Sequence, residues 1–138
     1  MASILKVDAM QGVTSAGDIT ITSEGGAATQ SLQQGLAKAW SQSQMYSSNT
    51  INDSLNTASL TDNAAGDFTL TTVSAFGNTA FCMGGATSGS NIIQDRGTRD
   101  NAYNLYRTTT TQRAGSRNDS GTLVDSNHNC VSFHGDLA

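Results

Sequence analysis

Apolar and polar residues alternate most clearly between residues 52 and 72, on both sides of a polar stretch. Apolar and hydroxyl-bearing side chains alternate up to Leu60, and they do so again from Phe68 to Leu70. A period of two is typical of a strand with one buried and one exposed face. Residues 61–67 are rich in Asp, Asn and Gly, which accept the backbone of a tight reversal. The pattern predicts a β-hairpin at the centre of an antiparallel sheet.

The rest of the chain toward the C-terminus continues with short apolar segments separated by polar or glycine-rich ones. The four threonines at 108–111 are β-branched, which favours a strand over a helix. We count six to eight short strands after Trp40, at the spacing of a small sandwich, and we predict an antiparallel β-sandwich domain over residues 41–138. Besides the hairpin, the predicted strands cover 79–83, 91–94, 103–112 and the segment of Val131 and Phe133, with loops at 84–90 and 114–121.

Residues 28–40 are the one helix candidate in the sequence. Leu32, Leu36 and Trp40 recur every four residues and would form one narrow apolar stripe. Gly35 costs a helix about 1 kcal/mol relative to alanine, so this short helix needs a packing partner. The stripe fits a three-helix contact at an oligomer axis, which makes the three side chains candidates for an oligomer interface. Packing on the domain's own sheet and a strand that runs through Trp40 are the alternatives.

Residues 1–27 consist of very short apolar–polar alternations interrupted by glycines. Isolated pairs of such strands are marginal in water, so this segment needs cover from other copies of the chain or from a larger surface. We therefore predict an extended N-terminal arm over residues 1–27, followed by the helix as an oligomerisation segment, in a trimeric assembly.

The composition is polar without being highly charged. Hydrophobic residues make up 36% and charged residues 13% of the chain, whereas about 25% of a typical domain is charged. Disordered chains are usually charged and poor in apolar residues, so an ordered chain with a thin core fits better. The many Ser, Thr and Asn side chains suit a sheet or a hydrogen-bonded subunit interface. The absence of proline leaves every backbone N–H available to a strand ladder.

The formal net charge is −4 and the pI is about 4.7. A nucleic-acid-binding protein needs a basic surface to displace counterions. Five arginines lie between residues 96 and 117, but aspartates are interspersed among them, so a salt-bridged or solvated surface explains them better. No apolar run reaches the roughly 18 residues of a membrane span, and the first residues lack the layout of a signal peptide. We expect neither nucleic acid nor a membrane as a partner, and synthesis in a cytoplasm.

Few residues are candidates for binding a metal. His128, Cys130 and His134 share one parity, so on a strand they would lie on one face, where three copies at a threefold axis could hold an ion. A solvated face opposite Val131 is the simpler interpretation, because ligands from one strand rarely close a tetrahedral site. Cys82 and Cys130 suffice for one disulfide, and the sequence leaves open whether they pair.

Other constellations also have simple interpretations. Residues 62–67 resemble a calcium loop but lack the twelfth-position Glu of the EF-hand, and a plain turn explains them. Trp40, Tyr103 and Tyr106 could stack on sugars, although packing in a core or interface is the ordinary use of such aromatics. The sequence carries no phosphate-binding motif and gives no geometry for a catalytic triad. We therefore expect no cofactor and no enzymatic activity.

Four blocks of the sequence, in this order, resemble small virion proteins of marine and freshwater bacteriophages, including cyanophages. The blocks cover residues 4–11, 32–40, 53–70 and the ending 134–138. The resemblance implies a tail-fibre-like or decoration component of a virion that is β-rich and trimeric, without catalytic residues. Residues 84–128 carry no resemblance. Family members tend to carry an aromatic residue after the Trp40 position, where this chain has a Ser/Gln run.

The expected function is that of a non-enzymatic structural protein on the surface of a tailed bacteriophage, assembled in the cytoplasm of the host. It would act as a capsid decoration or cement protein on the major capsid protein, or as a short fibre attached to tail proteins. The lack of a long fibrous shaft favours the cement role. The alternatives are a tail-fibre protein that binds a receptor such as a host surface glycan, and a carbohydrate-binding module outside any particle.

Overall fold

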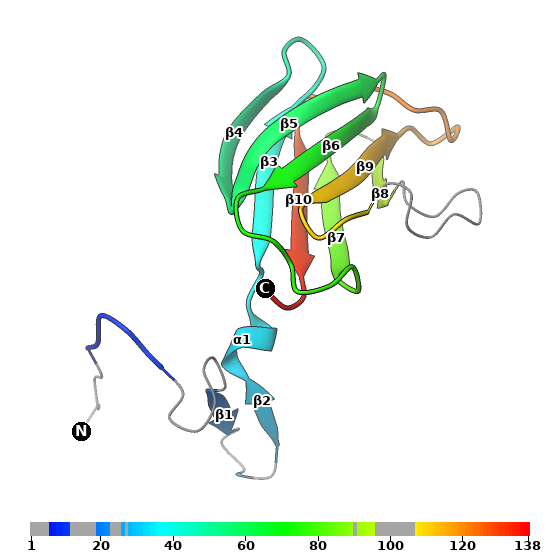
Figure 1. The fold of residues 1–138 in the computed structure, drawn as a ribbon. Coiled ribbons are helices and arrows are strands. Elements are labelled where there is room, and N and C mark those ends of the chain that lie inside the picture. Colours follow the sequence, from blue (N-terminus) through cyan, green and yellow to red (C-terminus); the bar gives the residue numbers. More distant parts are fainter. Residues whose placement is uncertain (1–5, 12–18, 23–25, 27, 90, 96–106) are drawn as a thin grey trace. The chain divides into compact units, whose positions relative to one another are not determined.

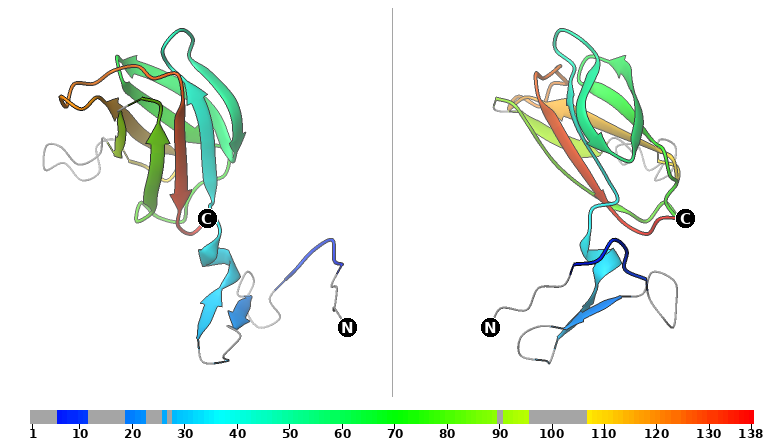
Figure 2. Two further views of the ribbon diagram at one scale, coloured as in Figure 1. Left: turned by 180° about the vertical axis from the view of Figure 1, so that it is seen from behind. Right: turned by 90° about the vertical axis from the view of Figure 1, so that its left-hand side faces the viewer.

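The computed structural model of the chain describes residues 6–11, 19–22, 26, 28–89, 91–95 and 107–138. The chain divides into two compact units, Met1–Leu36 and Ala37–Ala138. The second unit is mainly β, as predicted, and consists of two four-stranded antiparallel sheets that lie face to face (Figure 1 and Figure 2). This confirms the predicted mainly β, antiparallel fold.

The two sheets have the strand orders β4-β3-β10-β7 and β5-β6-β9-β8. The chain crosses from one sheet to the other after β4, β6, β7 and β9. The first sheet comprises β3 (Ala39–Gln44), β4 (Thr50–Leu55), β7 (Cys82–Thr87) and β10 (Asn129–His134). The second sheet comprises β5 (Thr57–Ala64), β6 (Asp67–Thr72), β8 (Ile92–Asp95) and β9 (Thr111–Arg117).

Aromatic side chains fill the core around the end of β10. All four phenylalanines of the chain are buried. Phe76 stacks on Phe81 with the ring centroids 4.6 Å apart, and Phe133 meets Phe81 edge-on at 5.8 Å. Offset-stacked and edge-to-face pairs are the favoured aromatic arrangements, so a few large rings supply much of the apolar core.

Hydrogen-bonded polar side chains fill the interior around the beginning of β10. Asn129 is fully buried, and its Oδ1 accepts a hydrogen bond of 3.1 Å from the Thr87 hydroxyl. The hydroxyls of Ser116 and Ser126 lie 2.7 Å apart, and the Asn91 amide donates to Ser126 at the same distance. Buried polar groups are tolerated when they are paired in this way. A chain with few apolar residues can therefore close a sandwich.

The predicted hairpin is present, with a shorter turn than expected. Only Ala65 and Gly66 separate β5 from β6, and Phe68 and Leu70 face the core as the alternation predicts. β5 lies at the edge of its sheet, so the hairpin is not central. Residues 52–55, which open the alternating segment, belong to β4 in the other sheet.

Asn56 turns the chain from β4 into β5. Its φ of 53° lies in the left-handed region, which Asn adopts more readily than most residues. Its side-chain amide donates to the carbonyls of Lys38 and Ser74 at 3.1 and 3.2 Å, and its Oδ1 accepts from the Ser74 N–H at 2.7 Å. These bonds tie the corner to the start of β3 and to the segment after β6.

Within its described residues, the N-terminal unit contains one small β-ribbon and one short helix. β1 (Thr20–Thr22) pairs with β2 (Thr29–Ser31), and α1 covers Leu32–Gly35. None of the residues of this unit whose burial is described is buried. Among the helices of the described chain, none is long and apolar enough to span a membrane.

The helix predicted over residues 28–40 is not observed, because α1 has four residues and β3 begins at Ala39. Leu32, Leu36 and Trp40 therefore do not line one helical face. Trp40 lies within a strand, as one of the alternatives proposed. Apolar residues spaced four apart also fit a chain that passes from a short helix into a strand. Hydrophobicity alone does not distinguish this path from one continuous helix.

Two strands occupy segments that were predicted as loops. β7 covers most of the predicted loop 84–90, and β9 extends into the predicted loop 114–121. Residues 108–110 precede β9 and belong to no strand, while 103–106 lie outside the described residues. The predicted strand at 91–94 and the last strand are confirmed as β8 and β10.

Candidate functional site

The candidate site lies on the outer face of the β4-β3-β10-β7 sheet. Every second residue of β3 is buried, beginning at Ala39, so Trp40 and Gln42 lie on the outside. The same alternation in β10 leaves Cys130 and Ser132 on the outside. The strand pattern therefore gathers an indole, an amide, a thiol and a hydroxyl on one face.

The side chains on this face become smaller from β3 to β7. The register aligns Trp40 with Leu55 on one side and with Ser132 on the other, and Ser132 is aligned in turn with Gly84. Cross-strand partners lie on the same face of a sheet. The neighbouring row across the four strands consists of Asp53, Gln42, Cys130 and Ala86.

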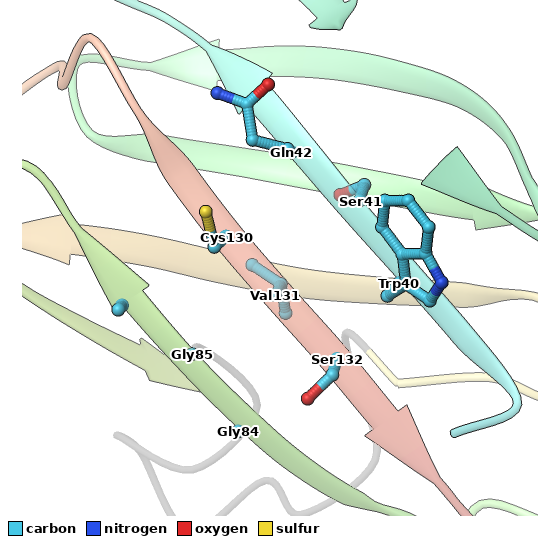
Figure 3. A pocket seen from close by; sticks show the side chains of 9 residues that line it. Trp40, Ser41, Gln42, Gly84, Gly85, Cys130, Val131 and Ser132 are labelled. Carbon is cyan, nitrogen blue, oxygen red and sulfur yellow. The ribbon is translucent and has the colours of Figure 1, made fainter. Parts of the chain in front are cut away.

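This decrease in size produces a groove of about 420 Å³ (Figure 3). The indole of Trp40 stands at the β3 side, and the small residues of β7 leave the opposite side open. A Cβ placed on Gly84 would meet only the Ser132 hydroxyl, at 3.5 Å. The groove is lined by Trp40, Ser41, Gln42, Gly84, Gly85, Ala86, Cys130, Val131 and Ser132.

The groove is electrically neutral. None of its nine lining residues, all of them within the described chain, is an acid or a base apart from the Cys130 thiol. Asp53 lies one strand farther out, beside Gln42. General acid–base catalysis needs a group that transfers protons near the working pH, held close to the reacting atoms. The lining provides no such pair of acid and base.

His128, Cys130 and His134 do not converge on one point. Cys130 and His134 lie on the outer face of β10, and His128 is exposed just before the strand, as the shared parity predicts. Four strand residues span about 13 Å, too far for one ion to bind both Cys130 and His134. Across the residues that the structure describes, no group of three His, Cys, Asp or Glu side chains could hold a metal.

The two cysteines are free and exposed. Cys130 is aligned with Ala86 of β7, whereas Cys82 is aligned with His134. This register separates the two cysteines by about 13 Å along the sheet, beyond the roughly 7 Å limit between the Cα atoms of a disulfide. A disulfide within one chain is therefore excluded in this fold.

The described arginines between residues 96 and 117 form bonds within the sandwich. Arg113 donates to both carboxylate oxygens of Asp67, at 2.7 and 2.8 Å. Arg107 pairs with Asp95 and lies over the Phe81 ring, 4.4 Å from its centroid. Burial lowers the pKa of the Arg107 guanidinium from its ordinary value, an effect that nearby Cys82 opposes; the group remains charged. The salt-bridged interpretation is supported for Arg107 and Arg113.

Several sequence candidates lie elsewhere or outside the described residues. The residues that resembled a calcium loop form the end of the β5–β6 hairpin. The Asp67 carboxylate there forms an ion pair with Arg113. Tyr103 and Tyr106 lie outside the described chain. The sequence singled out Trp40 but missed Gly84 and Ala86, because β7 carries no hydrophobic alternation.

Comparisons with family models, with curated proteins and with solved structures gave no match to this chain. The groove supplies a binding surface, and the contrast between the two units of the chain supplies a second observation.

Proposed function

We propose that the chain is a non-enzymatic structural protein on the surface of a tailed bacteriophage virion. In this proposal the N-terminal unit attaches the protein and joins its copies into a trimer, while the β-sandwich faces outward. The protein serves as a capsid decoration or cement protein, or as a short fibre on the tail. The resemblance of four sequence blocks to virion proteins is the reason for choosing a virus particle as the attachment surface.

One structural observation carries the proposal: the two units differ in how they bury apolar residues. The buried apolar core runs from Ala39 to Phe133 and thus belongs entirely to the sandwich. The N-terminal unit instead leaves large apolar side chains at least half exposed: Val7, Met10, Ile21 and Leu36.

Such a unit needs cover from outside itself. A two-stranded ribbon is marginally stable at best in water, and the paired strands β1 and β2 have three residues each. Sister chains or a particle surface would supply that cover, and the sandwich would remain free to face solvent or a neighbouring shell subunit.

The direct test places the protein on purified particles of the phage whose genome encodes it. A labelled antibody against the sandwich, viewed by electron microscopy, should decorate the particles. Label across the shell would assign the cement role, and label confined to the tail would assign the fibre role. A protein that is abundant in infected cells but missing from purified particles would overturn the proposal.

A pair of variants tests the attachment role of the N-terminal unit. Changing Ile21→Asn and Leu36→Asn together should reduce incorporation into particles at least tenfold, measured by quantitative mass spectrometry. Val73→Asn is the matched control, because Val73 is 71% exposed but lies in the sandwich. Equal incorporation of all three proteins would contradict attachment through the N-terminal unit.

A further inference from the structure

We propose that the groove on the β4-β3-β10-β7 sheet is a binding site for a neutral saccharide, which stacks on Trp40. This proposal assigns a ligand to the chain, and it does not depend on the virion role. Its location on a sheet face follows from the two cross-strand rows described above.

The groove has the size of a small-molecule site and an aromatic wall. Trp40 is only partly buried, and Leu55, its partner on β4, is 48% exposed, so this apolar strip faces solvent. Across the groove from the indole lies Gly84, which has no side chain (Figure 3), and Ala86 adds only a methyl group to the lining. The volume of about 420 Å³ falls within the roughly 300–1,000 Å³ of small-molecule sites.

The groove combines one aromatic face with polar side chains that have no protein partner among the described residues. A pyranose ring has an apolar face of C–H groups and a rim of hydroxyls, so it needs an aromatic surface and hydrogen-bonding groups beside it. Within the described chain, the side chains of Gln42 and Ser132 hydrogen-bond to no other protein group. Their amide and hydroxyl can therefore donate to and accept from the hydroxyls of a bound sugar.

The charge of the lining selects among sugars. No acidic or basic side chain other than the Cys130 thiol lines the groove, so nothing there would pair with a carboxylate, sulfate or phosphate on a ligand. Burying an unpaired charge is costly. Asp53, aligned with Gln42 on β4 and outside the lining, adds a negative charge near the groove that would repel an anion. The site therefore favours uncharged sugars over sialylated or sulfated ones.

The binding test uses Trp40 itself, which is the single tryptophan of the chain. The full-length protein is titrated with cellobiose, maltotriose, chitobiose and mannobiose while tryptophan emission is recorded, and it is applied to a printed array of bacterial surface glycans. We expect a saturable change in emission with at least one neutral sugar and neutral glycans among the array signals. Sialyllactose and a sulfated heparin disaccharide should produce no change.

Two variants remove the site by different routes. Trp40→Ala deletes the stacking surface, and Gly84→Val fills the groove while keeping the indole as reporter. Each should weaken binding at least tenfold, measured by calorimetry for Trp40→Ala and by emission for Gly84→Val. Tyr46→Ala is the control, because Tyr46 is an exposed aromatic that does not line the groove, and its affinity should stay within twofold of the unmodified chain. Thermal melts confirm that each variant is folded; if Trp40→Ala is not, Gly84→Val decides.

No response to any neutral sugar or array glycan at millimolar concentration would overturn the proposal. Binding that survives both variants, or that is restricted to anionic sugars, would also overturn it. These outcomes are separate from those of the virion proposal. If the protein is found on particles but binds no sugar, only the groove assignment is wrong. If it binds sugar but is missing from particles, only the virion role is wrong.

Discussion

Gly66 is the residue on which the turn between β5 and β6 depends. Its φ is 65°, and a Cβ there would lie 2.3 Å from the Val124 nitrogen and 2.6 Å from the Ser116 oxygen. Its N–H donates to Asp125 at 2.6 Å. Left-handed backbone costs a non-glycine residue about 1–2 kcal/mol, and the backbone clash adds to this. We expect Gly66→Ala to lower the free energy of unfolding by about 3 kcal/mol, measured by urea unfolding.

Gly121 provides the matched control for Gly66. Its φ is 79°, but no atom lies within 4 Å of its added Cβ. Gly121→Ala should therefore cost only the conformational strain, about 1 kcal/mol. Equal losses for the two variants would show that the turn does not pack against the 116–125 segment as described.

Asp67 holds the start of β6 through its two bonds to Arg113. The Asp67 side chain is only 3% exposed, whereas that of Arg113 is 22% exposed. Removing one partner of a buried pair usually costs 3–5 kcal/mol, but Arg113 can regain water. We therefore expect Asp67→Asn to lose about 2 kcal/mol of stability in urea unfolding. Asp62→Asn, at an exposed carboxylate in the same hairpin, should change stability by less than about 0.5 kcal/mol.

At the scale of elements, the sequence predicts the strands whose inward residues are apolar and misses those whose inward residues are small or polar. Phe68 and Leu70 in β6, and Val131 and Phe133 in β10, give a readable period of two. β3 buries Ser41 and Ser43, so its alternation is hidden from hydrophobicity. The groove could be predicted only in part for the same reason. Trp40 stands out in the sequence, but the open side of the groove depends on glycines in β7, and only the strand register shows which residues lie beside them.

The two adjacent glycines of β7 have opposite roles, which can be tested. A Cβ on Gly85 would lie 2.5 Å from Ile93 Cγ2 and 2.7 Å from the Cys130 carbonyl oxygen, whereas a Cβ on Gly84 meets only Ser132 at 3.5 Å. Gly85→Ala should push β7 away from its neighbours and cost about 2–3 kcal/mol. Gly84→Ala should be neutral or slightly stabilising, because glycine is unfavourable within a strand. Thermal and urea unfolding of both variants measure the difference, and equal effects would contradict the inward placement of Gly85.

At the scale of the whole molecule, the low hydrophobic content has two different consequences. The sequence suggested that a single copy could not hold its first third in shape and that the later core would be thin. The sandwich compensates with aromatic packing near Phe133 and with hydrogen-bonded hydroxyls around Asn129. The N-terminal unit has no comparable core among its described residues. Composition anticipates the shortage of apolar material but not its distribution between the two units.

This distribution leads to a prediction about assembly. If exposed apolar residues of the N-terminal unit join three copies, the full chain should sediment at about 43 kDa, three times the 14.3 kDa of one chain. A chain shortened to residues 37–138 should sediment as a monomer and still unfold cooperatively, because every residue of the buried apolar core lies within it. Analytical ultracentrifugation and thermal melts of the two proteins test both points. A stable monomer of the full chain would remove the trimer, whereas a trimer of the shortened chain would move the contact from the N-terminal unit to the sandwich.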